Sequence, residues 1–406
     1  TTANGGDVTD AEGDDIIFTA SDGTTQLAHE VEKYTATTGE LVAWVRVPSL
    51  ASTSTIYIYY GNSSVTTFQG NVTSNGVTGV WDTNFKGAWH LKETGSPPAT
   101  WADSTSNART LTTFNNPIAQ ASGKIGNSME VDTTDNDGAD ASDQVDFDVA
   151  PFTISAWIRP TELPSTSGHN GYYIAKRHNA GPWESWMIWS NSNAGGDQNY
   201  FQFIVRDNNQ TWYGTAANAA MSINTWYHIV GSIDSSKVVR LYINGAVQTA
   251  TSTLTTTPAV FPSNSVFRVG EGGAAAAAYF DEVKFSDTAR SAGWITTEYN
   301  NQNSPSGFYA VGAETTSSYT QSAYRLFNNL DSTDVGTPLT NYSNGYNFRR
   351  LIDITDAQVS SGPHTNFPML VSTTLLDLRT TANGGDVTDA QGDDIIFTAS
   401  DGITQL

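Results

Sequence analysis

Cysteine is missing from this 406-residue chain, which excludes disulfide bonds and thiolate metal sites. Basic residues are scarce: 19 lysines and arginines stand against 41 aspartates and glutamates, for a formal net charge of −22. Nucleic acids need a basic surface, and anionic membranes repel an acidic one, so neither is an expected partner. Divalent cations are the partners that this charge attracts. No apolar run is long enough to span a bilayer.

Helical periodicity is almost absent as well. Short alternating runs, separated by glycine, asparagine and aspartate, predict antiparallel sheets instead. Residues 152–160 place alternate apolar side chains on one face, and Asn244-Gly245 between two strand-like runs is a strong hairpin signal. Residues 200–214 predict another hairpin, and residues 288–301 predict a short helix. The expected class is an all-β sandwich.

Composition divides the chain into four segments. Residues 1–70 hold dense strands, and residues 74–314 form a larger β unit bounded by stretches rich in glycine, threonine and serine. Residues 315–345 are a polar connector, and residues 346–406 follow it.

The first 27 residues recur at the other end of the chain. Residues 1–27, the N-terminal repeat, and residues 380–406, the C-terminal repeat, are identical at 25 positions. The two exceptions are Glu12/Gln391 and Thr24/Ile403. This duplication indicates one small β domain split between the termini, as if the chain had been cut inside it. The residues expected at this repeat seam are Asp14, Ile16, Phe18, Asp393, Ile395 and Phe397.

Three phrases of the split domain carry a family resemblance: DIIFTASDGTTQLAHEVEKY, LVAWVRVPSL and IYIYYGN. Residues 347–372 followed by residues 1–65 resemble domain of unknown function 2341. The resemblance covers the small domain completely, in permuted order. The small domain is therefore expected to be a second, smaller β-sandwich.

The middle of the chain carries GAWHLKE, GKIGNSMEVD, FTISAWIRP and FDEVKFSDTARSAGWITTEYNN in that order. These motifs resemble the concanavalin A-like and laminin G-like jelly rolls that often follow the small domain in large bacterial surface proteins. The resemblance implies a jelly-roll sandwich over residues 74–314 and an extracellular, cell-surface location. It does not fix the function, because jelly rolls host lectins, adhesins, hydrolases and spacers alike.

Asp281 lies in an otherwise apolar row of a predicted strand, where a carboxylate must be paired, hydrogen-bonded or bound to a cation. Related jelly rolls commonly use this aspartate, with a loop like ADSTSNAR, to hold structural calcium. The resemblance therefore implies a calcium site of Asp103, Asn107 and Asp281 with backbone carbonyls. An aspartate that accepts backbone N–H bonds is the alternative. The acidic runs 7–15 and 132–148 are either further cation sites or solvated loops.

The tryptophans of GPWESWMIW are candidates for sugar stacking. Trp183 and Trp189 are the expected ligand-binding pair. Strand alternation turns Trp186 and Ile188 inward and points Met187 and Trp189 the other way, so the alternative is that some of these rings belong to the core.

Catalytic motifs are missing. The chain has no Glu-x-Asp-x-x-Glu run of the retaining glucanases with this fold, no HExxH, no GxSxG and no P-loop. We therefore expect a protein that is not an enzyme.

The leading hypothesis is a structural module of a repetitive surface protein or fibre whose partners are further copies of itself. These copies are linked in tandem, paired by strand donation between chains, or closed within one chain, since 346–379 with 1–70 completes a domain and leaves 380–406 spare. The alternative is a calcium-dependent lectin or adhesin that binds glycans through the jelly roll.

Overall fold

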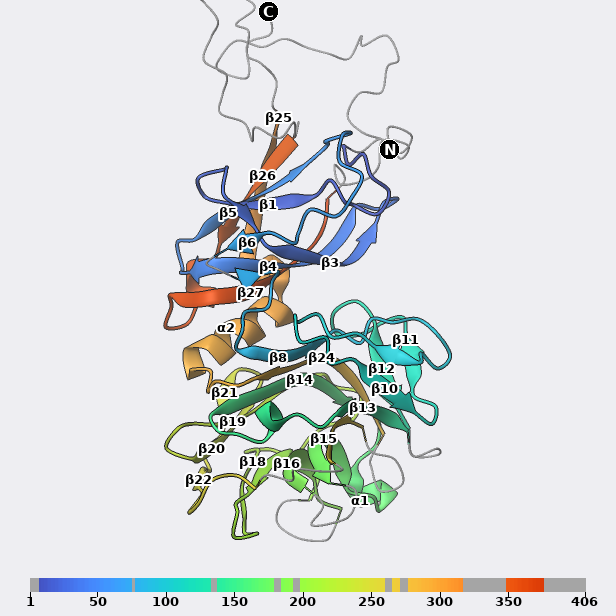
Figure 1. Ribbon diagram of the computed structural model, residues 1–406, viewed down its shortest axis with the longest axis vertical. Coiled ribbons are helices and arrows are strands. Elements are labelled where there is room, and N and C mark those ends of the chain that lie inside the picture. Colours follow the sequence, from blue (N-terminus) through green and yellow to red (C-terminus); the bar gives the residue numbers. More distant parts are fainter. Residues whose placement is uncertain are drawn as a thin grey trace, which may run out of the picture. The chain divides into compact units, whose positions relative to one another are not determined.

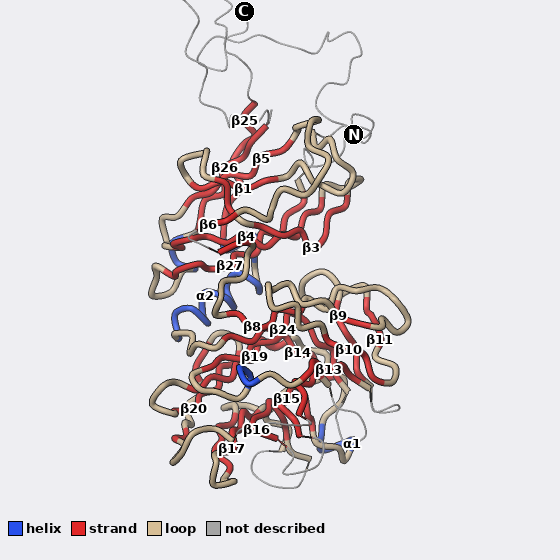
Figure 2. The backbone as a smooth tube through the Cα atoms, viewed as in Figure 1, coloured by secondary structure: helices blue, strands red, loops and turns tan. Residues whose placement is uncertain are grey.

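Among the described residues strands far outnumber helical turns (Figure 2). This computed structural model describes residues 7–74, 77–132, 137–178, 184–192, 198–259, 265–270, 277–316 and 348–375. The chain forms two compact units (Figure 1). The small unit combines Thr1–Val80, Ser304–Gln358 and Thr365–Leu406, and the large unit combines Trp81–Asn303 and Val359–His364.

The small unit contains two sheets and a short hairpin. Its five-stranded sheet has the order β2 (Gln26–Leu27), β1 (Ile17–Ala20), β5 (Thr55–Tyr60), β26 (Phe348–Ile354) and β25 (Tyr309–Thr316). Its three-stranded sheet has the order β27 (His364–Thr374), β4 (Glu40–Leu50) and β3 (His29–Thr35). The hairpin pairs β6 (Thr73–Ser74) with β7 (Val77–Thr78).

Strands from opposite ends of the chain complete both sheets of the small unit. β26 lies between β5 and β25, and its register with β5 pairs Phe348 with Tyr60 and Ile352 with Ile56. β27 lies beside β4. Of the three arrangements considered from the sequence, this one is closure within a single chain.

The large unit contains a nine-stranded and an eight-stranded sheet. The first has the order β11 (Ile118–Gln120), β12 (Ser128–Val131), β24 (Ala278–Ser286), β14 (Phe152–Pro160), β19 (Tyr227–Ile233), β20 (Val238–Ile243) and β21 (Ala246–Val247), with β8 (Phe85–Trp89) on β24 and β22 (Ser252–Thr253) on β20. The second has the order β18 (Trp212–Ala216), β17 (Gln202–Arg206), β16 (Glu184–Ser190), β15 (Gly171–His178), β23 (Ser265–Val269), β13 (Gly138–Ser142), β10 (Leu111–Phe114) and β9 (Thr100–Trp101).

Side chains from both large sheets meet in one apolar core. Alternation in β14 correctly predicts its core-facing residues, which are Phe152, Ile154, Ala156 and Ile158. Aromatic rings join the two sheets: Phe152 lies 5.6 Å from Trp186, and Trp89 stacks on Phe267 with 4.8 Å between ring centroids. Such rings bury large apolar areas, which makes the unit the predicted all-β sandwich.

Both predicted hairpins are present. Asn244 and Gly245 connect β20 to β21 with φ angles of 51° and 77°, the left-handed pair that a type I′ turn needs. β17 and β18 form the second hairpin.

The predicted helix begins later than expected. α2 spans Ala292–Asn303, and the Ser291 hydroxyl accepts a hydrogen bond from the Trp294 N–H at 3.2 Å. The Thr153 hydroxyl of β14 bonds both the Thr288 carbonyl and the Arg290 N–H, which holds the preceding residues against the sheet. The remaining helical turns are short: α1 (Pro164–Ser167), α3 (Pro305–Phe308) and the 3₁₀ turns η1 (Val145–Phe147) and η3 (Asp356–Gln358).

The domain boundaries differ from the prediction: residues 74–80 and 304–314, expected in the jelly roll, belong to the small unit, and Val359–His364 belongs to the large unit. Residues 309–314 were expected in the jelly roll, yet β25 pairs with β26, with Tyr309 opposite Ile354, inside the small unit. The partner strand lies beyond the predicted connector 315–345, so no local pattern identifies it. Nearly all of that connector lies outside the described residues. In the described part of the chain, no helix is long and apolar enough to cross a membrane.

Candidate functional site

The loop that follows β9 contains two of the predicted calcium ligands. Asp103 Oδ1 accepts hydrogen bonds from the N–H groups of Ala88 and Thr105 at 3.0 and 2.9 Å. Its Oδ2 accepts bonds from the Thr105 hydroxyl at 2.9 Å and the Arg109 N–H at 2.7 Å. A carboxylate offers about four acceptor positions, and here three donors of the loop and the Ala88 N–H of β8 occupy them. Four hydrogen bonds therefore hold the Asp103 carboxylate in this arrangement.

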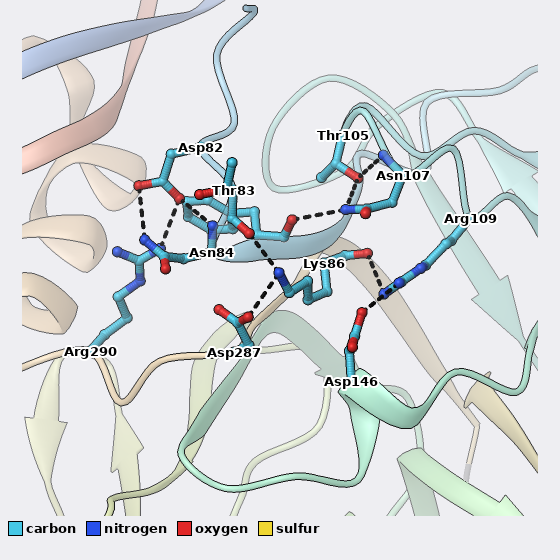
Figure 3. Close-up of polar contacts among 11 residues, drawn as sticks. Asp82, Thr83, Asn84, Lys86, Thr105, Asn107, Arg109, Asp146, Asp287 and Arg290 are labelled. Atoms are coloured by element: carbon cyan, nitrogen blue, oxygen red, sulfur yellow. Dashed lines mark hydrogen bonds and ion pairs between the residues drawn. The ribbon is translucent and has the colours of Figure 1, made fainter. Parts of the chain in front are cut away.

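Amide and basic groups form further polar contacts in this loop and in the region around β8 (Figure 3). The Asn107 side-chain amide donates to the Phe85 carbonyl at 3.1 Å and to the Thr105 hydroxyl at 3.2 Å. Arg109 pairs with Asp146 at 2.6 Å, and the basic side chains of Lys86 and Arg290 pair with further aspartates of this region. Basic side chains therefore neutralise these carboxylates.

Asp281, the third predicted ligand, lies in β24 and is fully buried. Its Oδ2 accepts the Ile125 N–H at 2.8 Å. The negative charge of Asp281 also acts on Lys124: burial lowers the pKa of Lys124 and Asp281 partly opposes that shift. Asp281 thus anchors the loop before β12, the alternative considered from the sequence. Calcium at these residues stays a prediction.

A buried cluster of charged groups lies on the same face of β24 as Asp281, the face turned away from the core, and was not identified from the sequence. Lys284 Nζ is 3.3 Å from carboxylate oxygens of both Glu282 and Glu298, the latter from α2. His90 Nδ1 is 2.7 Å from Glu282, and His228 Nε2 is 3.7 Å from Glu298. These ion pairs could not be predicted from the sequence, because the paired residues come from separate parts of the chain. They lie in β19, β24 and α2 and at the residue that follows β8.

The pKa values of this cluster follow from burial and pairing. Burial alone raises the pKa of Glu282, but His90 and Lys284 hold it below the usual range. Burial lowers the pKa of His228 to about 4, against the opposing charge of Glu298. Glu282 is therefore ionised and His228 neutral at neutral pH, which suits a structural role better than proton transfer.

The outer face of the eight-stranded sheet carries a second apolar cluster. Met187 and Trp189 of β16 lie in it with Tyr172 and Ala175 of β15 and Ile204 of β17. Trp186 and Ile188 lie in the core instead, which confirms the predicted alternation. The Nε1 of Trp189 has no hydrogen-bond partner among the described residues. Trp183 lies outside the described residues.

Trp212 extends this outer face and was not singled out from the sequence. It pairs in register with Arg206, whose guanidinium lies 4.2 Å from the centroid of the indole ring. Its side chain is 36 % exposed. Its place as the first residue of a hairpin strand was visible in the sequence, but its face was not.

The repeat-seam residues of the N-terminal repeat lie in and just before β1. Ile16 and Phe18 are fully buried, and Phe18 packs edge-on against His29 at 5.3 Å. Asp14 is half-buried. The seam residues of the C-terminal repeat, Asp393, Ile395 and Phe397, lie outside the described residues.

Asp15, which the sequence did not distinguish from Asp14, holds this segment in place. Its buried Oδ2 accepts the N–H groups of Gly61 and Asn62 at 3.1 and 3.2 Å and both the N–H and hydroxyl of Thr9 at 2.9 and 2.8 Å. Its Oδ1 accepts the Asp10 N–H at 3.1 Å. One carboxylate thus fastens the start of β1 to the end of β5.

Comparison with solved structures finds matches at low identity and with TM-scores below 0.5. The binding domain of botulinum neurotoxin serotype D is 12% identical with a TM-score of 0.41, covering 54% of this chain and 52% of that one. The binding domain of Paraclostridial Mosquitocidal Protein 1 is 15% identical with a TM-score of 0.42, covering 53% and 52%. The chain thus spans about half the length of these toxin domains.

A third similar structure is domain 4 of AbnA, a GH43 extracellular arabinanase from Geobacillus stearothermophilus, solved in complex with arabinotriose. It is 16% identical with a TM-score of 0.41, and the match covers 52% of this chain and 97% of that one. No curated protein matches the chain.

Family models match two stretches of the chain. Residues 12–90 match the domain of unknown function 2341, and residues 132–296 match the concanavalin A-like lectin/glucanases superfamily in its laminin G-like form. These are the two families that the sequence motifs predict. The chain therefore combines a domain of unknown function 2341 with a concanavalin A-like, laminin G-like jelly roll.

Proposed function

We propose that the chain is a non-enzymatic structural module of an extracellular, repetitive protein, linked to further copies of itself through the small unit. The observation that carries this proposal is the set of strands from which the small unit is built. Strands β26 and β27 follow the connector, yet they complete the sheets of β1, β4 and β5. Each small unit therefore needs one segment from either side of a jelly roll.

The duplicated segment supports tandem linkage in particular. After β27 the chain continues into the C-terminal repeat, which offers the β1 and β2 sequences a second time. In a tandem array each small unit would take β26 and β27 from one period and β1 to β5 from the next. The differences at Glu12/Gln391 and Thr24/Ile403 fit this history, because tandem copies diverge slowly in sequence.

Intact-mass measurement of the protein from its native source tests the array. A mass well above 43.6 kDa, in steps of one period, is the expected result. A native chain of 43.6 kDa would overturn tandem linkage. Linkage between separate chains would then require a concentration-dependent oligomer of that single-period chain in light scattering.

A second candidate function, glycan binding by the jelly roll, is favoured by the outer face of the eight-stranded sheet. The ring centroids of Trp189 and Tyr172 lie 6.2 Å apart there. Aromatic faces suit pyranose rings, which present apolar C–H groups to them.

A glycan array tests this second function, with Trp189→Ala as the variant and Trp226→Ala as a matched tryptophan control outside the outer-face cluster. Loss of binding in the Trp189 variant alone is expected. Calcium dependence is tested by repeating the array and the thermal melt in EDTA. We expect a Tm unchanged within about 1 °C, because the Asp103 carboxylate already accepts four hydrogen bonds from the protein. A fall in Tm that Asp281→Asn abolishes would restore the predicted calcium site.

A further inference from the structure

We propose that residues 386–406 of the C-terminal repeat can take the β1–β2 position of the small unit in place of residues 7–27, entering it directly from β27. This inference rests on the proposed self-linking function and names the segment that performs it. Two segments of nearly the same sequence, residues 7–27 and 386–406, then compete for the β1–β2 position.

The position itself is closely defined. β1 lies between β2 and β5, with Ile17 opposite Tyr59 and Phe18 opposite Ile58. Phe18 is fully buried, so any occupant needs a large apolar side chain at this point. The C-terminal repeat has Phe397 at the equivalent position.

The polar contacts of the position are available to both occupants. Asp15 accepts hydrogen bonds from Thr9 and Asp10 within the repeat and from Gly61 and Asn62 at the end of β5. The residues that correspond to its partners within the repeat, and to Asp15 itself, are Thr388, Asp389 and Asp394. The β5 groups stay where they are. Every bond of this clamp can therefore form again.

The two differences between the repeats fall where they do not disturb these contacts. Glu12 and Thr24 are exposed. Their backbone N–H groups donate to Asp10 and Asp22 at 3.0 and 2.8 Å, bonds that a glutamine or an isoleucine forms equally well. Gln391 also removes one negative charge from an acidic turn.

The route into the position is short. The Leu375 N–H donates to the Gly39 carbonyl at 3.3 Å, so the chain leaves β27 at the turn between β3 and β4. Tyr34, near that turn in β3, packs so closely on Gly13 that a Cβ there would lie 2.9 Å from its ring. The segment before β1 therefore lies at the same end of the sheet.

Chain length allows this entry. Residues 375 and 386 are 11 positions apart, and an extended chain of that length reaches roughly 36 Å. A short link also holds the C-terminal repeat at an effective concentration in the millimolar range, well above that of a second molecule. Entry from the same chain is thus preferred over entry from a neighbour.

Hydrogen exchange of the full 406-residue chain with Phe18→Asp tests the inference. The charge expels the N-terminal repeat from the buried position. We expect the amides of residues 396–399 to exchange at least about 100-fold more slowly in this variant than in the parent chain, while light scattering shows a monomer. Fast exchange at 396–399 overturns the inference, whatever the melting temperature of the variant.

Phe397→Asp is the matched control. It should leave residues 17–20 protected, and the double variant should lose protection at β5, where Tyr57 and Tyr59 pair with β1. Protection at 396–399 that appears only in dimers overturns entry from the same chain. The outcome is independent of the native mass: an array without strand replacement refutes this inference alone, and strand replacement in a 43.6 kDa native chain refutes tandem linkage alone.

Discussion

Asp15 shows how far the role of one residue depends on partners elsewhere in the chain. The acidic pair Asp14-Asp15 before a buried strand was visible, but alternation could not decide which side chain turns inward, because residues 15–19 are all buried. The deciding groups, Gly61 and Asn62, lie 46 and 47 positions away. The same limit applies to Asp281, whose need for a partner was predictable while the Ile125 N–H was not.

Loss of this clamp has a measurable cost. We expect Asp15→Asn, combined with Asp394→Asn so that neither repeat keeps the carboxylate, to lower the free energy of unfolding of the small unit by about 2–4 kcal/mol. An asparagine side chain presents an N–H donor where the carboxylate presented an acceptor. Some of the backbone N–H groups that donate to Asp15 then lose their acceptor. Urea titration followed by hydrogen exchange of the β5 amides measures this unit alone.

The paired variant Asp14→Asn with Asp393→Asn is the control for that prediction. Asp14 is half-buried, and burial followed by the charges of Asp10, Glu12 and Asp15 raises its pKa, so neutralising it relieves repulsion. Its effect should stay within about 0.5 kcal/mol. Equal losses of stability from both pairs of substitutions would show that the hydrogen bonds of Asp15 do not stabilise the small unit more than Asp14 does.

Two buried histidines predict acid sensitivity in both units. Burial lowers the pKa of His29 in the small unit and of His228 in the large unit, each to about 4. Between about pH 6.5 and pH 4 the unfolded chain binds these protons and the folded chain does not, so stability is complete above about pH 6.5 and falls as the pH is lowered. The expected loss is about 3 kcal/mol for each histidine by about pH 4.

Thermal melts between about pH 7 and about pH 4.5 measure this loss. His29→Gln, which removes the titrating group and keeps a polar side chain, should make the small unit less sensitive to pH and leave the large unit unchanged. A small unit that loses as much stability in this variant as in the parent chain would exclude His29 as the cause.

At the scale of elements, local signals were reliable and long-range ones were not. Asn244-Gly245 predicted its hairpin because a type I′ turn needs two residues that tolerate positive φ, a requirement inside the turn itself. The start of α2 was misplaced because Thr153, on β14, binds residues 288–290. β25 was assigned to the wrong unit because its partner β26 follows the long connector.

Two glycines with the same φ angle allow the cost of backbone strain to be distinguished from the cost of a steric contact. Gly245 and Gly168 both have φ of 77°, but a Cβ on Gly245 would lie 3.1 Å from the Tyr299 Cβ, whereas a Cβ on Gly168 meets nothing within 4 Å. We expect Gly168→Ala to cost about 1 kcal/mol and Gly245→Ala about 2 kcal/mol or more. Urea denaturation of the large unit measures both.

The comparison between these two variants is the test. Because both glycines have the same left-handed φ angle, the difference between the two losses of unfolding free energy measures the contact with α2. Identical costs would mean that Tyr299 moves aside freely and that the hairpin does not constrain the helix.

At the scale of the whole molecule, the small unit is distributed over the chain while the large unit is nearly continuous. The family resemblances predicted this organisation from local phrases. Strand order could not follow from them, because the pairing of β26 with β5 joins residues separated by most of the length of the chain. Cooperative folding of the small unit must therefore wait for both segments, which raises the entropic cost of closing it.

Truncation tests this dependence. A chain that ends at Thr316 lacks β26 and β27, and with them buried residues such as Ile352, Phe367 and Leu370. Each such side chain contributes about 1.5–3 kcal/mol on burial, so the loss of many exceeds the roughly 5–15 kcal/mol that a domain has in total. We expect calorimetry of this chain to retain the transition of the large unit and to lose that of the small unit.

A chain that ends at Arg379 is the matched control, because it keeps both strands and removes only the C-terminal repeat. It should show both transitions. Adding a separate polypeptide of residues 346–379 to the shorter chain should restore the second transition, since the sheets need these strands and not their covalent connection. Restoration would mean that one small unit can be built from two molecules, as linkage between chains requires. Failure to restore it, with the peptide in excess, would limit self-linking to tandem copies on one chain.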